Sequence, residues 1–316
     1  MKLMLAPMAG VTDWPFRLLC YEQGCDMHVT EMISAQGYIT AKATTTAYIN
    51  LTASSKDEGQ LIAQIFGHEP IYMAQAASRL TQTGQFVGID INMGCPAHKV
   101  VGSGSGSALM KDEILVGEIV REVKKSTLLP VSVKMRLGWD ESSINAVKIA
   151  QIVQEEGASF ITVHGRTRTQ QYQGKANIDE IAKVKQAVSI PLYANGDVVD
   201  VKSALEMVRI TACDGLAIGR GAMGNPFIFA QLKACFDGKS PVMPTTSEIV
   251  ATARRHAEMM QAWKGERSAL LEMRKHIAWY IRGQKGASVL RGRVNTAETF
   301  DEMYALLDAF QTNIVE

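Results

Sequence analysis

The sequence predicts a (β/α)8 TIM barrel, an α/β fold, followed by a small C-terminal all-helical bundle. Short apolar runs recur through the first three quarters of the 316 residues, segments with helical periodicity separate most of them, and the strand signal then disappears. Strands that alternate with helices favour a parallel sheet, and eight such units in about 230 residues fit a barrel of roughly 250 residues. A doubly wound open sheet is the alternative, but its first-strand G-x-G-x-x-G turn is absent.

Eight strands account for the barrel. They are expected at Leu3–Met8, Met27–Ile33, Leu61–Gly67, Val87–Cys95, Pro130–Arg136, Phe160–Arg166, Pro191–Asp197 and Gly215–Arg220. Among the connecting helices, DEILVGEIVREVKKS (112–126) has one apolar face made of Ile114, Leu115, Ile119, Val120 and Val123. Another helix, INAVKIAQIVQEEG (144–157), closes at Gly157. Residues 35–60 read poorly as a helix and are expected to form an irregular crossover.

The domain boundaries follow a change in composition. Residues 1–238 are expected to form the barrel, and residues 239–246, which contain prolines and threonines, a linker. Residues 247–316 then carry a helical pattern in about four segments, with Thr246 or Ser247 available as a helix N-cap.

Composition and charge exclude several classes of protein. The chain is 47% hydrophobic and 21% charged with a formal net charge of +1, so any nucleic-acid or membrane partner must be argued from local clusters. No apolar run reaches the roughly 18 residues of a membrane span. Five scattered cysteines without a C-x-x-C pair indicate neither a disulfide framework nor a zinc site, and no H-x-E or H-E-x-x-H spacing supports a metal. We therefore expect a cytoplasmic monomer without metal.

Polar residues gather at the carboxyl ends of the expected strands, where a barrel forms its active site. These ends carry Ala6-Pro7-Met8-Ala9-Gly10, Gln64, Asn92 with Cys95, Lys134 with Arg136, His164-Gly165-Arg166, Asn195-Gly196-Asp197 and Gly219-Arg220-Gly221. The last two groups place glycines and an arginine where barrels commonly hold phosphate, so they predict a phosphate-bearing cofactor or substrate.

Three of these residues leave more than one role open. Lys134 could form a Schiff base, pair with an anion, stabilise a reduced flavin or join a structural ion pair. His164 could be a core histidine, although its place before Gly165-Arg166 favours a ligand contact. Cys95, between a glycine and a proline, could be a core thiol or a reactive one. The following loop VVGSGSGSALM (100–110) matches no nucleotide-binding spacing and is expected to be a mobile loop beside the site.

The motifs together resemble the tRNA-dihydrouridine synthases, most closely the bacterial branch typified by tRNA-dihydrouridine synthase B. They are APMAGVTDWPFR, DINMGCPAHKV, VSVKMRLGWD, TVHGRTRTQQYQG, ANGDV and IGRGAMGNP, in order from residue 3 to about 293. The resemblance implies a barrel that binds FMN, is recharged by NADPH and carries a helical domain that grips tRNA. It implies flavin contacts from Pro7, Met8, Ala9, Gln64, Lys134, His164, Asn195, Gly196, Asp197, Gly219 and Arg220. Asn92 and Arg166 would contact the substrate, and Cys95 would be the general acid.

The implied chemistry suits Cys95. Reduction of the uracil C5–C6 bond needs a hydride at C6, which FMN N5 would supply, and a proton at C5. An ordinary thiol, with a pKa of about 8.5, is protonated at neutral pH and can donate that proton. A dehydrogenase of a small pyrimidine-like substrate, also an FMN barrel, is the alternative function. A redox-free binder or lyase that uses Lys134 as a Schiff base is a third.

A basic stretch in the helical region favours the RNA substrate. Between Arg274 and Arg293 the chain has six basic residues and no acidic one. Leu270, Met273, Ile277 and Ile281 would form the buried stripe of one helix, which leaves Arg274, Lys275 and Arg282 at its side. We therefore expect these three residues to contact tRNA phosphates while the target base is flipped into the barrel.

Overall fold

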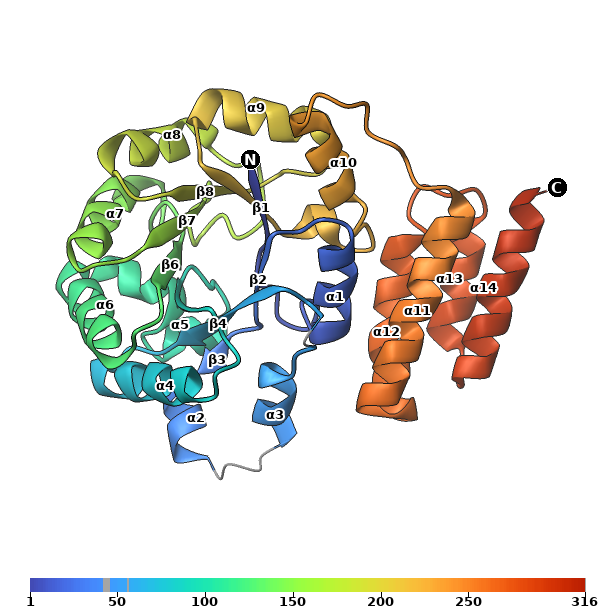
Figure 1. The fold of residues 1–316 in the computed structure, drawn as a ribbon, viewed down its shortest axis with the longest axis horizontal. Helices are drawn as coiled ribbons and strands as arrows, with labels where there is room; N and C mark the ends of the chain where they lie inside the picture. The colour runs from blue at the N-terminus through green and yellow to red at the C-terminus, as the bar shows by residue number, and fades with distance from the viewer. Residues whose placement is uncertain (42–45, 56, 316) are drawn as a thin grey trace.

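The computed structural model describes residues 1–41, 46–55 and 57–315 and confirms the barrel (Figure 1). All strand pairs are parallel, and the pairing of β2 with β4 closes a ring of eight strands, to which the short β3 adds a further pairing. The strands are β1 Lys2–Leu5, β2 Met27–Val29, β3 Ile33–Ser34, β4 Gln60–Phe66, β5 Gly88–Met93, β6 Val131–Met135, β7 Phe160–His164, β8 Leu192–Asn195 and β9 Gly215–Ile218. The single strand expected at 27–33 is thus two short strands that both pair with β4.

Alternation along the strands divides the barrel interior into two layers. Met4, Ile62, Tyr193 and Ala217 point inward and form a small apolar core. Two residues after Ile62 and Tyr193 the inward positions are the polar Gln64 and Asn195, whereas Ala6 and Gly219 follow Met4 and Ala217. The strand register sets these polar positions side by side, for example Gln64 beside Asp90, Asp90 beside Ser132 and Asn92 beside Lys134. A polar floor is therefore built into the barrel mouth.

Helices pack around the barrel as expected, with two differences. They are α1 Trp14–Glu22, α2 Ala35–Thr40, α3 Thr46–Thr52, α4 Pro70–Gln82, α5 His98–Gly102, η1 Gly106–Lys111, α6 Glu113–Ser126, η2 Glu141–Ser143, α7 Ala146–Glu155, α8 Ile178–Ala187, α9 Val201–Thr211, η3 Arg220–Ala222 and α10 Ile228–Phe236. The region expected to be irregular contains α2 and α3, because Tyr48 and Leu51 pack against the core. On α6, Ile114 is 77% exposed, and Val116 takes its place on the buried face. Residues 42–45 and 56 lie outside the described part.

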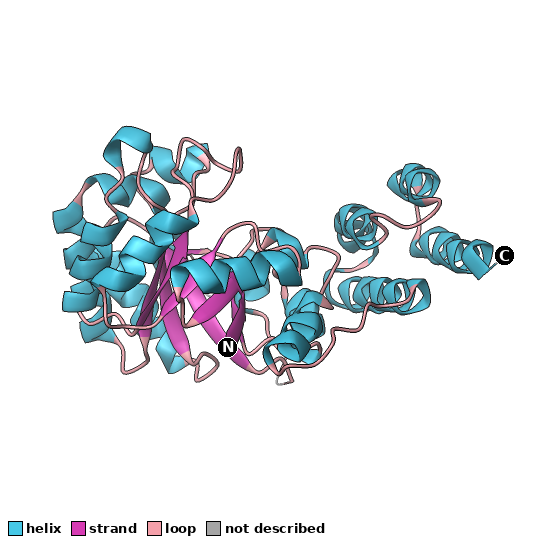
Figure 2. Cartoon of the chain, turned by 90° about the horizontal axis from the view of Figure 1, so that it is seen from above, coloured by secondary structure: helices cyan, strands magenta, loops and turns pink. Residues whose placement is uncertain are grey.

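The C-terminal region forms a strand-free group of helices beside the barrel (Figure 2). Its helices are α11 Thr246–Lys264, α12 Glu266–Tyr280, α13 Ala287–Thr296 and α14 Phe300–Val315. Thr245 and Glu248 form a capping box at the start of α11. The helices share their own core, in which the expected stripe Leu270, Met273, Ile277 and Ile281 is buried. No helix in the described ranges is long and apolar enough to cross a membrane.

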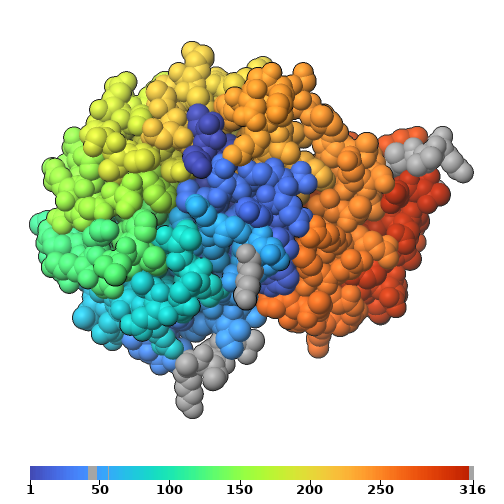
Figure 3. All heavy atoms as spheres, in the orientation of Figure 1, coloured from blue at the N-terminus to red at the C-terminus, as the bar shows by residue number. Residues whose placement is uncertain are grey.

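The helical domain packs tightly against the barrel, and the blue N-terminal segment lies beside the orange start of this domain in Figure 3. Phe227 of the barrel packs against Ile249, Ala253 and Tyr280. Gly224 has a φ of +67°, and a Cβ at this position would come within 2.3 Å of the Trp279 backbone. A glycine is therefore required here, because no side chain fits between the two domains.

Candidate active site

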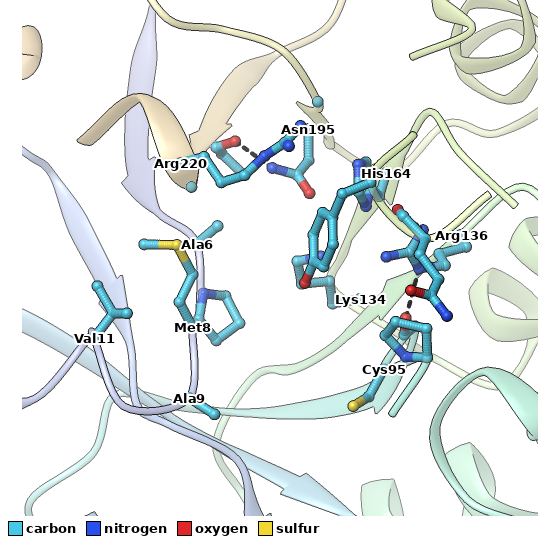
Figure 4. A pocket seen from close by; sticks show the side chains of 18 of the residues that line it. Ala6, Met8, Ala9, Val11, Cys95, Lys134, Arg136, His164, Asn195 and Arg220 are labelled. Carbon is cyan, nitrogen blue, oxygen red and sulfur yellow. Dashed lines mark hydrogen bonds between the residues drawn. The ribbon is translucent and has the colours of Figure 1, made fainter. Parts of the chain in front are cut away.

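A cavity of about 930 Å³ opens at the carboxyl ends of the barrel strands. Figure 4 shows Arg220, Asn195 and His164 on one side of it and Cys95 on the opposite side, with Met8 and Ala6 facing Lys134. The cavity brings together fourteen of the residues predicted from the sequence, namely Pro7, Met8, Ala9, Gln64, Asn92, Cys95, Lys134, His164, Asn195, Gly196, Asp197, Gly219, Arg220 and Arg282. Its volume suits a cofactor with a second planar group beside it.

A buried chain of hydrogen bonds fixes the floor of the cavity. Ser132 Oγ donates to Asp90 Oδ1 at 2.6 Å, and Gln64 Nε2 donates to Asp90 Oδ2 at 2.7 Å. Asn92 Nδ2 then donates to Gln64 Oε1 at 2.8 Å. The Asn92 Oδ1 atom accepts from the backbone N–H of Cys95 at 2.9 Å. Asn92 therefore orients the turn that carries Cys95, in addition to any contact with substrate.

The segment after Cys95 holds this turn from the other side. Ser107 donates to the Cys95 carbonyl from both its backbone N–H, at 3.1 Å, and its hydroxyl, at 2.9 Å. Gly106 has a φ of +61°, and a Cβ there would lie 2.9 Å from the Cys95 carbonyl oxygen. We expected a mobile loop here, but Ser105 and Ser107 are buried and the segment is largely helical. Of its three glycines, Gly106 alone packs closely against Cys95, whereas Gly104 lies near His68 and Gly102 meets open space.

Basic side chains, Lys134 and Arg136 among them, set the charge of the cavity wall. Burial, together with repulsion from the Arg136 guanidinium, lowers the pKa of Lys134 to about 8, even though Asp90 and Cys95 attract its charge. The Nζ atom of Lys134 has no hydrogen-bond partner within the described ranges. Burial and the neighbouring cations, Lys134 first, hold the pKa of His164 well below its usual range, so His164 is neutral. This wall is suited to binding an anion.

Asp197 organises the end of the cavity near strands β8 and β9. Its carboxylate accepts from Arg166 Nη2 at 2.7 Å, from Arg220 Nη2 at 2.9 Å and from the Ala176 N–H at 2.8 Å. Although burial alone would raise it, these contacts hold the pKa of Asp197 below its usual range. A carboxylate repels phosphate, so Asp197 is placed to orient Arg220 more than to bind the anion itself.

Two of the glycines predicted at the phosphate end have different packing. An added Cβ at Gly196, where φ is +128°, would lie 2.8 Å from the Ala176 side chain. At Gly219 it would meet only Met8 Sδ at 3.6 Å and Ala6 at 3.9 Å, which is ordinary contact. Protein packing therefore does not require a glycine at 219. The bare backbone faces the cavity beside Arg220, as the close approach of a phosphate requires.

The structure also brings in residues to which the sequence assigned no role. Tyr172, from the loop after β7, is 56% exposed, and its ring lies 5.1 Å from the Arg220 guanidinium carbon and 5.7 Å from that of Arg136. Arg136 itself donates to the carbonyls of Gly94, Thr167 and Gln171. In the sequence, only the aromatic residue in TQQYQG pointed to this contact. A lone tyrosine on a loop follows no spacing pattern that would identify it as a site residue.

The remaining predicted substrate residues lie outside the cavity. Arg166 is fully buried and donates to Asp197 and to the carbonyls of Gln173 and Gly174. It therefore holds the loop after β7 in place. Arg274 Nη2 donates to the Ala297 carbonyl at 2.7 Å within the helical domain. Lys275 Nζ donates to the Gly10 carbonyl at 2.7 Å across the domain contact. Of the three basic residues predicted on the helical domain, only Arg282 reaches the cavity rim.

Comparisons with known proteins agree along nearly the whole chain. Residues 4–315 match the family model described as dihydrouridine synthase. The tRNA-dihydrouridine synthase B of Pseudomonas aeruginosa is 37% identical over 310 residues, which cover 98% of this chain and 92% of that protein. A probable tRNA-dihydrouridine synthase of Mycobacterium tuberculosis is 38% identical and covers 97% and 81%.

A likeness to a solved structure concerns the fold alone. A histamine dehydrogenase from Rhizobium sp. 4-9 superposes with a TM-score of 0.56 at 11% identity. The match covers 82% of this chain and 49% of that one.

Proposed function

Since this chain belongs to the dihydrouridine synthase family, we propose that it reduces the C5–C6 double bond of a D-loop uridine in tRNA. The proposed reaction converts the uridine and NADPH, with one proton, into dihydrouridine and NADP⁺ in the cytoplasm. FMN is the proposed bound cofactor. The observation that carries the proposal is the cavity at the barrel mouth, which Cys95 lines together with Lys134, Arg136 and Arg220, and whose rim an arginine of the helical domain reaches.

The residues present fit an FMN molecule. Arg220 and the bare backbone at Gly219 would hold its phosphate. Lys134, which has no hydrogen-bond partner among the described residues, would face the electron-rich edge of the ring. Met8 and its neighbours Pro7 and Ala9 offer an apolar surface for the ring face. When bound and reduced, FMN supplies the hydride that uracil C6 requires. The chain's own residues bind it, orient it and exclude water from it.

Cys95 would donate the proton to C5. Its backbone is held by Asn92 and Ser107, so the thiol has a fixed position at the cavity wall. Donation leaves a thiolate, and Lys134 and Arg136 are close enough for their charges to interact with it. Nearby cations stabilise a thiolate, so the barrier to proton transfer falls. Asn92 would contact the uracil as well as hold the turn.

The helical domain favours tRNA over a small pyrimidine. Arg282 lies at the rim of the same cavity that Cys95 lines. Lys285, Arg291 and Arg293 follow it in sequence, are exposed, and have no acidic residue between them. A base that enters the barrel from tRNA leaves its phosphates at this rim, where guanidinium groups bind them.

The decisive experiment incubates the purified protein with FMN, NADPH and an unmodified tRNA transcript, and maps dihydrouridine by position. We expect one or more D-loop uridines to be reduced, with NADPH consumed in equal amount. Reduction of free uracil or dihydroorotate chemistry, without any change in tRNA, would instead support the small-molecule dehydrogenase. A protein that takes up no flavin would contradict both.

A further inference from the structure

A cluster of buried titratable side chains lies at the contact between the two domains, and none of them lines the active-site cavity. Asp13 caps α1 of the barrel, His256 belongs to α11 and His276 to α12. All three side chains are at most 2% exposed. One ligand-type atom from each, a carboxylate oxygen or an imidazole nitrogen, lies within 4.8 Å of the other two.

Several polar atoms of this cluster have no hydrogen-bond partner in the described part of the chain. They are Asp13 Oδ2, His256 Nε2 and both ring nitrogens of His276. Buried polar atoms are almost always paired with protein, water or an ion. Unpaired atoms that converge from three separate elements therefore indicate that a shared partner belongs between them.

Tyr280 and Phe16 orient the His256 ring so that its Nε2 atom is directed at Asp13. Its Nδ1 atom lies 3.3 Å from the Tyr280 hydroxyl, and its ring stacks on Phe16 with 5.7 Å between ring centroids. These contacts leave Nε2 directed at Asp13 Oδ1, 3.8 Å away. A histidine whose second nitrogen is held by a neighbouring group is the usual arrangement of a metal ligand.

The local charge leaves room for a cation. Lys264 Nζ lies 3.8 Å from Asp13 Oδ2, but its close partner is Glu272 at 2.7 Å. Arg17 is likewise paired with Glu58 at 2.6 Å. Lys275, which also faces the cluster, donates to the Gly10 carbonyl. The nearest cations are thus held by other partners, which leaves the Asp13 carboxylate without a close cationic partner among the described residues.

We propose that Asp13, His256 and His276 form a site for a divalent transition metal, with zinc the best match, which joins the helical domain to the barrel. One carboxylate and two imidazoles are a usual zinc ligand set. Tetrahedral zinc keeps its ligand atoms about 3.4 Å apart, so small side-chain rotations would complete the site. Water would take the fourth position. The site is structural, since it lies apart from the cavity that Cys95 lines.

The test uses tag-free, full-length protein and needs neither flavin nor tRNA. Metal content is measured as purified, the protein is stripped with a chelator, and zinc is titrated against a chromophoric chelator. We expect one tightly bound zinc per chain, a visible-band spectrum of tetrahedral cobalt when Co²⁺ replaces it, and a rise in Tm on zinc addition. Binding no stronger than that of the surface background, with Tm unchanged, would overturn the proposal and assign the space to water.

Two matched variants locate the metal. His276→Asn should weaken zinc affinity at least about 100-fold and remove the rise in Tm, because loss of a ligand exceeds the 10–100-fold effect of losing an outer partner. His28→Asn is the control, since His28 is also a buried histidine with both ring nitrogens unpartnered in the described part of the chain, but lies on β2 beside Tyr21 of α1 and is not part of the cluster. Equal zinc affinity in all three proteins would overturn the assignment. Should His276→Asn fail to fold, Asp13→Asn, which keeps the hydrogen bond to Phe16, gives the same expected loss.

Discussion

The barrel mouth and the domain contact each bury a carboxylate among polar side chains, but they partner it differently. At the mouth, both oxygens of Asp90 accept short hydrogen bonds, and the chain continues through Gln64 and Asn92 to Cys95. At the domain contact, Asp13 faces two histidines across gaps that no hydrogen bond spans. A complete network specifies one geometry, whereas an incomplete one indicates a missing partner. The first suits a catalytic floor and the second a ligand site.

The largest expected effect tests whether Cys95, at the barrel mouth, takes part in catalysis. Cys95→Ala should reduce dihydrouridine formation by roughly 10²–10⁴-fold, because the proton donor is lost. Single-turnover assays with tRNA transcript measure the rate. Flavin absorbance and filter binding serve as controls and should match the unaltered protein. Full turnover by the alanine variant would rule out Cys95 as the acid.

The next test compares the two buried carboxylates directly. Asp90→Ala should lower the free energy of unfolding by about 1–3 kcal/mol, because Ser132 and Gln64 are left buried without an acceptor. In metal-free protein, Asp13→Asn should cost about 1 kcal/mol or less, because the cap to the Phe16 N–H is kept and only long ionic contacts of 3.8 Å to Lys264 and His256 are lost. Urea unfolding followed by circular dichroism measures both. Equal losses would remove the distinction between the two clusters.

A third prediction concerns the rim where the domains meet the cavity. Arg282→Glu should weaken tRNA affinity by roughly tenfold and lower the slope of log affinity against log salt by about one, since a phosphate contact is lost. Arg209→Glu, an exposed arginine on α9, is the control for general charge. Flavin content should stay constant in both variants. A salt titration that superposes on the unaltered protein would refute a role for Arg282 in RNA binding.

The smallest expected effect is a pH dependence of FMN affinity at the barrel mouth. The pKa of Lys134 is depressed to about 8, so its charge is present below that pH and is lost as pH rises through it. The affinity of flavin-free protein for FMN should therefore fall between pH 7 and pH 9, measured by fluorescence quenching. Lys134→Arg should flatten this dependence, because a guanidinium stays charged. A flat profile in the unaltered protein would exclude Lys134 as the anion partner.

Sequence reasoning predicted the mouth better than the domain contact for a physical reason. Parallel strands end at the same face of a barrel, so Lys134, His164 and Asn195 could be expected together without coordinates. Helix faces carry no such constraint. Arg274 and Lys275 were expected on one helix face with Arg282, yet α12 ends at Tyr280, before Arg282, and each of the other two meets a carbonyl of a neighbouring segment that no periodicity identifies.

The cluster at the domain contact could not have been predicted by spacing. Asp13 is more than two hundred residues away from His256 and His276 in the chain, and motif rules for metals depend on short spacings. Ile114 shows a related limit, since Ile119, Val120 and Val123 of α6 are buried as expected but the first residue of the expected face lies in solvent and Val116 is buried instead.

The bond from Lys275 to the Gly10 carbonyl joins the two halves of the molecule at a sensitive place. Gly10 follows Pro7, Met8 and Ala9, the turn that lines the cavity, and its N–H is held in turn by Glu31. A displacement of the helical domain must either carry this turn along or break the bond. This turn therefore connects the domain proposed to bind tRNA with the cavity wall proposed to face the flavin ring, so we expect the optical spectrum of bound flavin to change when tRNA binds.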